Sequence, residues 1–467
     1  MTNAADGASK LDHPHENPSR IVWALAWPAV ALNSLQVINT LLDRGFIGHL
    51  PSAALTAHGG SINVLFLMFS LAMALGTAAT ALVSRAFGAG EVNTYRMASK
   101  QSFSISIFVG VALGGVTALI APWAAHLILP AEDRAAMDLM TRFVQVYSIG
   151  LPAIYVIQAL AGSLRGVGDT KSPMFISGIQ ILLHIVLNFL LIFPTREVGG
   201  VTIPGAGLGL IGAGLALALS AWASAIVYVL YTPRTELGLV WDVRLPEIDW
   251  VRRILRVAVP AAVMSVLRVF SLTAFTLVLK NVPNASAAIA AMGVAFAIEG
   301  IMFMPSFGLS TAAAALVGQS LGMKRPDRAE RLGWLAGHYS ALVTLLLAGP
   351  IFFAAPQIAT LLLGSKPEII RETTEFLRML CVTEVFFAYS MVMMGAMQGA
   401  GDTVRPMWIS VIAMWGLRVP MAFLLALPIG LSLGARGAWI SMSLTQAIQG
   451  IMSLIVFKQG AWKTKEV

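Results

Sequence analysis

The chain has 467 residues, of which 57% are hydrophobic and only 12% charged, and its mean hydropathy is +0.78. Soluble domains carry about 25% charged residues, so this chain has too little charge to solvate a globule of its size, and its surface is expected to face lipid. The single cysteine, Cys381, excludes a disulfide framework or a cysteine-based metal cluster, and no cofactor is expected. The net charge of +8 indicates basic loops on one side of a membrane rather than nucleic-acid binding.

The N-terminal tail, residues 1–19, is polar and of mixed charge, unlike a cleaved signal peptide. Beyond it, apolar segments are long enough to span a bilayer, which takes about 20 mostly apolar residues for a hydrocarbon core roughly 30 Å thick. Twelve such spans are predicted, at residues 20–43, 60–83, 101–124, 140–163, 173–194, 209–231, 254–279, 286–310, 333–355, 376–398, 405–428 and 434–457.

The distribution of lysine and arginine predicts the orientation of these spans. If the N-terminus is cytoplasmic and residues at the span ends are counted with the adjoining loops, that side holds 20 of the 31 basic residues, the opposite side holds nine, and two lie deep inside spans. Basic residues accumulate in cytoplasmic loops of membrane proteins. The chain is therefore expected to be a multi-pass inner-membrane protein with both termini in the cytoplasm.

Four segments of the first half recur in the same order in the second half, at offsets between 225 and 234 residues. The matching pairs are 164–174 with 397–407, 82–88 with 316–322, Pro28 with Pro260, and 212–213 with 437–438. Six spans per half is an even number, so both halves insert the same way and form a parallel repeat. The predicted fold is all-α and integral to the membrane, with two six-helix bundles related by a pseudo-two-fold axis along the membrane normal.

This repeat divides the chain into predicted domains. They are a cytoplasmic tail (1–19), an N-terminal six-helix lobe (20–231), a cytoplasmic linker (232–252), a C-terminal six-helix lobe (253–457) and a second cytoplasmic tail (458–467). Halves of this kind rock about a central cavity during alternating access. Pro28 and Pro260 lie inside spans, where proline kinks a helix, and are expected to act as conformational hinges.

The longest repeated segment contains a Gly-Xaa-Gly-Asp-Thr loop after the fourth span and again after the tenth. Glycine supplies a left-handed backbone angle, and Asp or Thr can cap the helix that follows. Pro173 and Pro406 then fall early in that helix, where the missing N–H costs little. A phosphate-binding function is not favoured, because no strand precedes the loop and no Gly-Lys-Ser/Thr follows it.

Together, the twelve spans, the repeated loops and the first span resemble the multidrug and toxin extrusion (MATE) family. In the first span, Pro28 and the segment 43–50 are similar to the family's Pro and Asp-x-x-x-x-Gly pattern. Residues 295–300, followed by Pro305, look like the prokaryotic DinF-type branch. The resemblance covers nearly the whole chain. It implies a secondary antiporter that exports drugs or metabolites in exchange for protons or sodium ions.

The resemblance also implies a cation site at Asp43, the acidic residue of the first span, which could bind a proton or a transient Na⁺. In the family branch this site is completed on the fifth span by an Asn and an Asp four residues apart. Here those positions hold His184 and Asn188, so the second carboxylate is missing. The spacing still places both on one helix face. If Asp43 has no such role, it is a solvated loop residue paired with Arg44.

Histidine has an ordinary pKa of about 6.5, so His184 could take the protonatable role that the missing carboxylate leaves open. The alternative is a neutral imidazole that hydrogen-bonds a neighbouring helix. Asn188 is expected to be a hydrogen-bonding wall of the site or a substrate contact. No resident metal is expected.

Other polar residues within spans are predicted to line the substrate cavity, because ionisable and polar groups in a membrane tend to face a cavity or a partner. In the N-terminal half these are Gln36, Asn39, Tyr155 and Gln158, and in the C-terminal half they are Glu299 and Met302. The alternative for Glu299, and for Glu384, is a structural pairing with Arg268 or Arg418.

The predicted function is export of cationic or amphipathic organic compounds by a monomer that contacts membrane lipid. The main alternative is a lipid-linked oligosaccharide flippase of the same superfamily, which would need a strongly basic central cavity. Only Arg268 and Arg418 lie deep within spans, more than five residues from either end. An enzyme is not expected, because no His-Glu-x-x-His motif is present and adjacent spans carry no paired aspartates.

Overall fold

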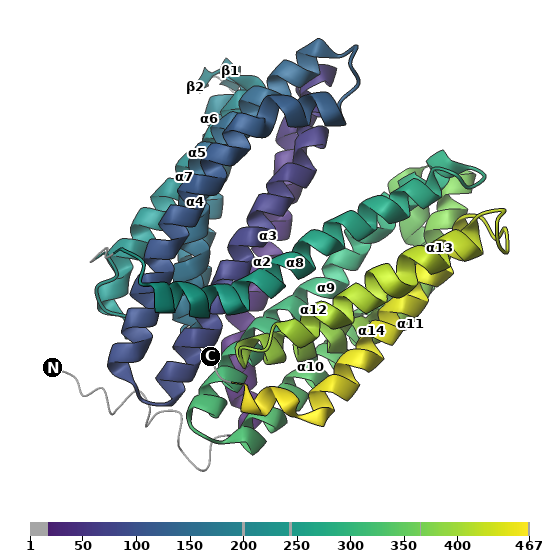
Figure 1. Ribbon diagram of the computed structural model, residues 1–467. Helices are drawn as coiled ribbons and strands as arrows, with labels where there is room; N and C mark the ends of the chain where they lie inside the picture. Colours follow the sequence, from purple (N-terminus) through teal and green to yellow (C-terminus); the bar gives the residue numbers. More distant parts are fainter. Residues whose placement is uncertain (1–16, 199–200, 242–244, 365, 466–467) are drawn as a thin grey trace. The chain divides into compact units, whose positions relative to one another are not determined.

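The computed structural model describes residues 17–198, 201–241, 245–364 and 366–465 (Figure 1). Within these residues, twelve helical spans are long and apolar enough to cross a membrane, as predicted. They are α2 (Pro18–Gly48), α3 (Ser52–Gly88), α4 (Val92–Ile128), α5 (Arg134–Gly166), α6 (Lys171–Ile192), α7 (Gly209–Tyr231), α8 (Ile248–Leu279), α9 (Ala285–Gly322), α10 (Pro326–Leu363), α11 (Pro367–Gly399), a broken eleventh span, and α14 (Ala435–Gln459). The eleventh span comprises α12 (Val404–Val411), η2 (Ile412–Arg418) and α13 (Val419–Ala426).

Most of these helices extend beyond the predicted spans. The longest are α9 and α10, with 38 residues each. Hydropathy marks only the part of a helix that lies in the hydrocarbon, whereas the backbone hydrogen bonds of a helix can continue into the polar interface. For the same reason Asp43 lies within α2, which continues to Gly48, and not in a loop after the first span.

A short β-hairpin follows α6 and was not predicted (Figure 1). Strand β1 (Pro194–Val198) pairs antiparallel with β2 (Val201–Ala206), and the register shifts between Pro194 and Arg196. Arg196 lies over the rings of Phe189 and Phe193, with its guanidinium carbon 4.1 and 4.3 Å from their centroids. This cation–π contact fixes the hairpin to the end of α6.

The chain forms two compact units. The N-terminal unit contains residues 34–87 and 91–258, and the C-terminal unit contains residues 17–33, 88–90 and 259–465 of the described chain. Apart from the short turn at residues 88–90, the divisions fall inside α2 and inside α8, so each of these helices contributes to both units. The described part of the predicted linker lies within the N-terminal unit, where Arg96 Nε donates to the Glu236 carbonyl at 3.0 Å.

Close helix packing in the N-terminal unit depends on small residues. A Cβ at Gly162 of α5 would lie 2.3 Å from the carbonyl oxygen of Gly76 on α3. Thr80 Oγ1, one turn further along α3, donates to the Gly162 carbonyl at 3.0 Å. Small residues let membrane helices approach this closely, and such contacts replace the hydrophobic driving force that lipid does not supply.

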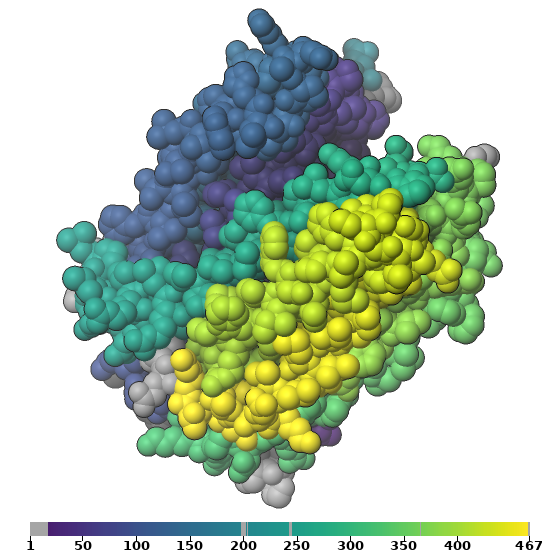
Figure 2. Space-filling view, turned by 45° about the vertical axis from the view of Figure 1, so that its right-hand side comes forward, coloured from purple at the N-terminus to yellow at the C-terminus, as the bar shows by residue number. Residues whose placement is uncertain are grey.

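The C-terminal unit repeats this arrangement. Gly395 of α11 stands 233 positions after Gly162, and a Cβ there would lie 2.9 Å from the carbonyl oxygen of Ser310 on α9. Ser310 Oγ in turn donates to the Met391 carbonyl at 2.8 Å. On another face of the same unit, α12 and α13 pack beside α14 (Figure 2). The sequence repeat therefore corresponds to the same helix contact in both units.

The two Gly-Asp-Thr loops have the same geometry. Gly168 and Gly401 are left-handed, with φ of 88° and 86°. In the first loop the N–H of Asp169 bonds the Leu164 carbonyl and that of Gly168 bonds the Arg165 carbonyl, each at 2.9 Å. This is the Schellman ending of a helix. Asp169 then caps α6 by accepting from Ser172 N at 2.9 Å. Of the two predicted capping residues, Asp169 makes the capping hydrogen bond and the Thr170 side chain makes none.

The eleventh span contains a π-helical segment, η2, between α12 and α13. Pro420 stands at the start of α13 and has no N–H to donate, so the regular α-helical ladder cannot continue through it. Wider turns of this kind inside α-helices are frequent at functional sites. Here the segment ends at Arg418, a buried residue of the C-terminal unit.

Candidate functional site

The clearest polar cluster inside the spans joins α2 to α6 within the N-terminal unit. Asn39 and Asp43 stand four residues apart on α2, and His184 and Asn188 stand four apart on α6. Residues at this spacing share a helix face, so two polar pairs face each other. Asn188 Nδ2 donates to Asp43 Oδ1 at 2.6 Å, and His184 Nδ1 lies 3.1 Å from Asn39 Oδ1.

The hydrogen bonds of this cluster are consistent with one neutral form of His184. Asn188 Nδ2 also lies 3.3 Å from His184 Nε2. An amide nitrogen only donates, so Nε2 accepts and Nδ1 carries the hydrogen that it donates to Asn39. Asn188 Nδ2 therefore donates both to Asp43 and to the imidazole of His184, and the imidazole in turn donates to Asn39.

The cluster combines two buried groups with one accessible carboxylate. His184 and Asn188 are buried, whereas Asp43 keeps 22% of its side chain exposed. His184 Nδ1 and Asp43 Oδ1 are 3.8 Å apart. Asp43 is thus placed to exchange an ion or proton with its surroundings, while the α6 residues orient it.

One atom of the cluster has no protein partner. Asn188 Oδ1 is buried, and within the part of the chain that the structure describes it accepts no hydrogen bond. Leaving a buried acceptor unpaired is unfavourable by about 1–3 kcal/mol. A donor or a cation at this point would remove that penalty.

The ends of α2 and α6 beyond the cluster are held together by aromatic side chains. Phe46 of α2 lies 6.2 Å from Phe193 between ring centroids, and the His49 ring lies 6.4 Å from Phe193. Ile47 and Ile192 pack in the same hydrophobic core. This packing fixes the two helices that carry Asp43 and Asn188 and so stabilises the geometry of the cluster.

A second polar group lies in the C-terminal unit, around Glu299 of α9. Gln446 of α14 donates from Nε2 to Glu299 Oε1 at 2.9 Å, and its Oε1 accepts from Thr383 of α11 at 3.3 Å. Arg418 Nε donates to Thr445 Oγ1 at 3.1 Å. Glu299 and Arg418 therefore each bond a neutral side chain.

Among the other buried side chains of this unit, Glu384 and Gln449 have atoms that lack hydrogen-bond partners within the described residues. These atoms are Glu384 Oε2 and both the oxygen and the nitrogen of the Gln449 amide. Gln446 and Gln449 were not singled out in the sequence. The signal for them was a polar stripe at helical spacing on the twelfth span, formed by Ser441, Thr445, Gln446, Gln449 and Ser453.

The remaining residues predicted for the substrate cavity are not brought together. Tyr155 is fully buried and donates to the Met68 carbonyl at 3.1 Å, and Met302 is fully buried in an apolar core with Ile298. Gln36 is exposed on α2, and Gln158 is half-buried on α5. Asn39, also predicted for the cavity, belongs instead to the Asp43 cluster.

The two predicted hinge prolines lie inside continuous helices. Pro28 is in α2 and Pro260 is in α8. These are the two helices that both compact units share, and the divisions between units, at 33/34 and 258/259, fall close to each proline.

Comparison with known proteins agrees with this architecture. The sequence matches the MatE family model over residues 28–190 and 260–424. It is 29% identical over 452 residues to "Probable multidrug resistance protein NorM" of Thermotoga maritima, covering 95% of this chain and 93% of that protein. It is 28% identical over 437 residues to a protein of the same description from Rhodopseudomonas palustris, covering 90% and 87%.

The fold matches that of a solved structure described as "Crystal structure of MATE in complex with MaL6", with a TM-score of 0.88, 20% identity and full coverage of both chains. The family match covers more than half of the chain and confirms the predicted resemblance. The chain therefore belongs to the MatE family, and it is a multi-pass membrane transporter rather than an enzyme.

Proposed function

We propose that the protein is a secondary active antiporter that exports cationic or amphipathic organic compounds across the cell inner membrane, with both termini in the cytoplasm. The observation that carries the proposal is the accessible carboxylate of Asp43, held between two apolar spans by Asn188. Ionisable groups inside membrane spans mark ion and substrate pathways. The curated relatives described as multidrug resistance proteins support organic compounds as the cargo.

In the proposed cycle, Asp43 binds a proton or Na⁺ from outside and releases it to the cytoplasm. Loading neutralises the only acidic side chain of the cluster and so removes its attraction for a cationic substrate. A ligand shifts a conformational equilibrium only through different affinities for the two states. Pro28 lies in the same helix as Asp43 and is proposed as the place where α2 changes its bend.

The hydrogen-bond pattern supports Asp43, and not His184, as the ion-binding group of the cycle. Both ring nitrogens of His184 already have partners when the imidazole is neutral. The unpaired Asn188 Oδ1 fits either ion, since a protonated Asp43 could donate to it and Na⁺ prefers oxygen ligands of this kind. An efflux experiment with separate proton and sodium gradients, described below, therefore distinguishes proton coupling from sodium coupling.

A flippase for lipid-linked pyrophosphates is less well supported. Such a substrate calls for an excess of positive charge. Arg268 and Arg418, the two arginines deep in the predicted spans, share the C-terminal unit with two span acids, Glu299 and Glu384. Asp43 adds negative charge in the other unit.

The test is efflux of a fluorescent organic cation from proteoliposomes, with proton and sodium gradients imposed separately. Wild-type protein is expected to respond to one of the two gradients, and Asp43→Asn should lower the coupled rate at least about tenfold, because an amide cannot carry the ion. The Asn side chain still presents an oxygen to Asn188, so folding should be retained. Transport that ignores both gradients would contradict an antiporter.

The matched control is Asp138→Asn. Asp138 is on α5 of the same unit, but its side chain is 60% exposed and pairs with Arg142 one turn away. Exposed pairs of this kind contribute about 0–1 kcal/mol, so this variant should transport like wild type. Coupled efflux by Asp43→Asn at the wild-type rate would rule out Asp43 as the coupling residue.

A further inference from the structure

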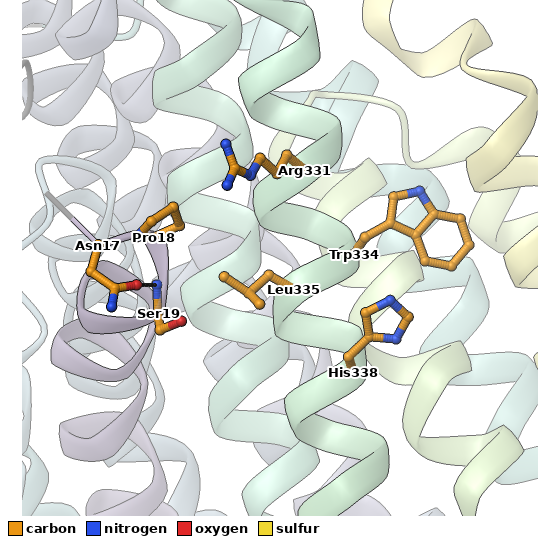
Figure 3. Close-up of a pocket in the computed structure, with 7 residues that line it drawn as sticks. All are labelled: Asn17, Pro18, Ser19, Arg331, Trp334, Leu335 and His338. Atoms are coloured by element: carbon orange, nitrogen blue, oxygen red, sulfur yellow. Dashed lines mark hydrogen bonds between the residues drawn. The ribbon is translucent and has the colours of Figure 1, made fainter. Parts of the chain in front are cut away.

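A cavity of about 400 Å³ lies between the start of α2 and the second and third turns of α10, both within the C-terminal unit. Its lining residues are Asn17, Pro18, Ser19, Arg331, Trp334, Leu335 and His338. Arg331 and Leu335 reach from α10 toward the start of α2, whereas Trp334 and His338 project from another side of α10 (Figure 3). The cavity is separate from the Asp43 cluster, which belongs to the other unit.

The charge facing this cavity is positive. Arg331 is exposed, and the adjacent acid, Glu330, is already bonded to Lys463 at 2.6 Å. The first turn of α2 adds the positive end of a helix dipole. Asn17 Oδ1, an oxygen acceptor next to that turn, already accepts a hydrogen bond from Ser19 N at 3.1 Å. A ligand with a negative group fits this charge. An organic cation, the cargo proposed above, would be repelled.

Aromatic rings line another part of the cavity, at Trp334 and His338 (Figure 3). Trp334 stacks on His338 with ring centroids 5.9 Å apart, and packs edge-on against Phe457 at 5.5 Å. One helical turn after Ser19, Trp23 of α2 lies 5.5 Å from Tyr339 of α10 between ring centroids. Tryptophan and tyrosine gather where a membrane protein meets the headgroup region of the bilayer.

Exposed apolar residues continue from the cavity along both helices. Ser19, Trp23 and Trp27 follow one face of α2 at intervals of four residues, and both tryptophans are exposed. On α10, exposed Leu342 and Leu346 continue the face of Leu335 at helical spacing. A ligand with a long apolar portion could therefore lie along these stripes.

We propose that this cavity binds an anionic phospholipid, with its phosphate beside Arg331 and one acyl chain along the apolar stripes of α2 and α10. The two chemical requirements are a negative headgroup and a hydrocarbon chain, and a phospholipid of the inner membrane meets both. Free phosphate would leave the stripes without a partner. A lipid bound here would link the first turn of α2 to α10.

The proposal is tested by native mass spectrometry of the full-length protein titrated with phosphatidylglycerol or phosphatidylcholine. We expect wild-type protein to bind its first phosphatidylglycerol more tightly than its first phosphatidylcholine. Arg331→Gln should reduce that preference about fivefold, which is the order of attraction that one basic side chain contributes near an anionic membrane surface. Arg331→Lys keeps the charge and should retain most of it.

Arg371→Gln is the matched control. Arg371 is also an exposed arginine of the C-terminal unit, but it lies in the first turns of α11 and contacts only its neighbour Glu372, at 3.4 Å, among the ion pairs of the described residues. Its substitution should leave the lipid preference unchanged. Equal binding of the two lipids by wild type, or an equal loss in Arg331→Gln and Arg371→Gln, would overturn the proposal. Displacement of the bound lipid by excess inorganic phosphate alone would overturn the role of the acyl chain.

Discussion

His184 connects the two helices of the candidate site without needing a charge. Its Nδ1 donates to Asn39 and its Nε2 accepts from Asn188. The imidazole thus links Asn39 of α2 to the Asn188 amide, which donates to Asp43. This role differs from that of a proton carrier, and the two roles make different predictions for substitution.

His184→Gln is expected to retain coupled efflux within about threefold of wild type. The glutamine amide can donate to Asn39 and accept from Asn188, as the neutral imidazole does, but it cannot bind a proton near neutral pH. The measurement is the efflux rate as a function of pH in proteoliposomes. Loss of coupling in His184→Gln, with normal folding, would assign the transported proton to His184.

His184→Leu provides the contrast. It removes the hydrogen bonds that the imidazole makes to Asn39 and Asn188, and the net contribution of one such bond is about 0.5–1.5 kcal/mol. The thermal unfolding midpoint in detergent should therefore fall for Leu and change much less for Gln. An equal midpoint in both variants would show that the hydrogen bonds of His184 contribute nothing to stability.

Part of the candidate site could be predicted from sequence. Asp43, His184 and Asn188 were found through the resemblance to the MATE family, whose cation site lies at these positions of the first and fifth spans. Helical spacing then placed 184 and 188 on one helix face. Asn39 was assigned to the cavity, although it stands four residues before Asp43 and so shares its face. Sequence could not reveal the bond between Gln446 and Glu299, because the two residues are 147 positions apart and belong to different helices.

At the scale of the helices, backbone contact between α3 and α5 depends on Gly162. Its carbonyl accepts from Thr80, and its Cα faces the carbonyl of Gly76. No side chain on either helix separates them at this point. The pair is therefore sensitive to the addition of a single methyl group.

Gly162→Ala should destabilise the protein by about 1–3 kcal/mol, the usual effect of overpacking a core, because the new Cβ would lie 2.3 Å from a main-chain oxygen that cannot rotate away. Gly115→Ala on α4 is the control, since a Cβ there meets nothing within 4 Å. It should be neutral or slightly stabilising. Thermal unfolding midpoints in detergent measure both, and a midpoint for Gly162→Ala at or above that of Gly115→Ala would contradict the packing.

Two elements were not predicted from the sequence, the hairpin β1–β2 and the π-helical segment η2, because hydropathy does not distinguish them from their surroundings. The hairpin β1–β2 is too short and too polar to stand out among apolar spans. The π-helical segment η2 has the composition of an ordinary span, and only Pro420 signals that its hydrogen bonds must shift. By contrast, the repeated loops were predictable because left-handed Gly168 and Gly401 have few alternatives to glycine.

At the scale of the whole molecule, the placement of basic residues leads to a prediction about topology. Loops on the side of both termini carry 20 of the 31 lysines and arginines. A green fluorescent protein fused after residue 467 should therefore fluoresce, because it matures in the cytoplasm, and alkaline phosphatase at the same position should be inactive. A fusion in the loop between α2 and α3 should give the opposite pair of results, and active phosphatase at the C-terminus would reverse the proposed orientation.

The sharing of α2 and α8 between the two units has a consequence for how the protein is made. The C-terminal unit requires residues 17–33, which are synthesised before the other described residues of either unit, whereas the N-terminal unit is complete only after residue 258 has been synthesised. The beginning of the chain must therefore remain in the membrane, without its final neighbours, while more than half of the protein is translated. If the chain were cut in the linker, each fragment would lack a helix segment of its own unit, so the two fragments should accumulate only when they are produced together.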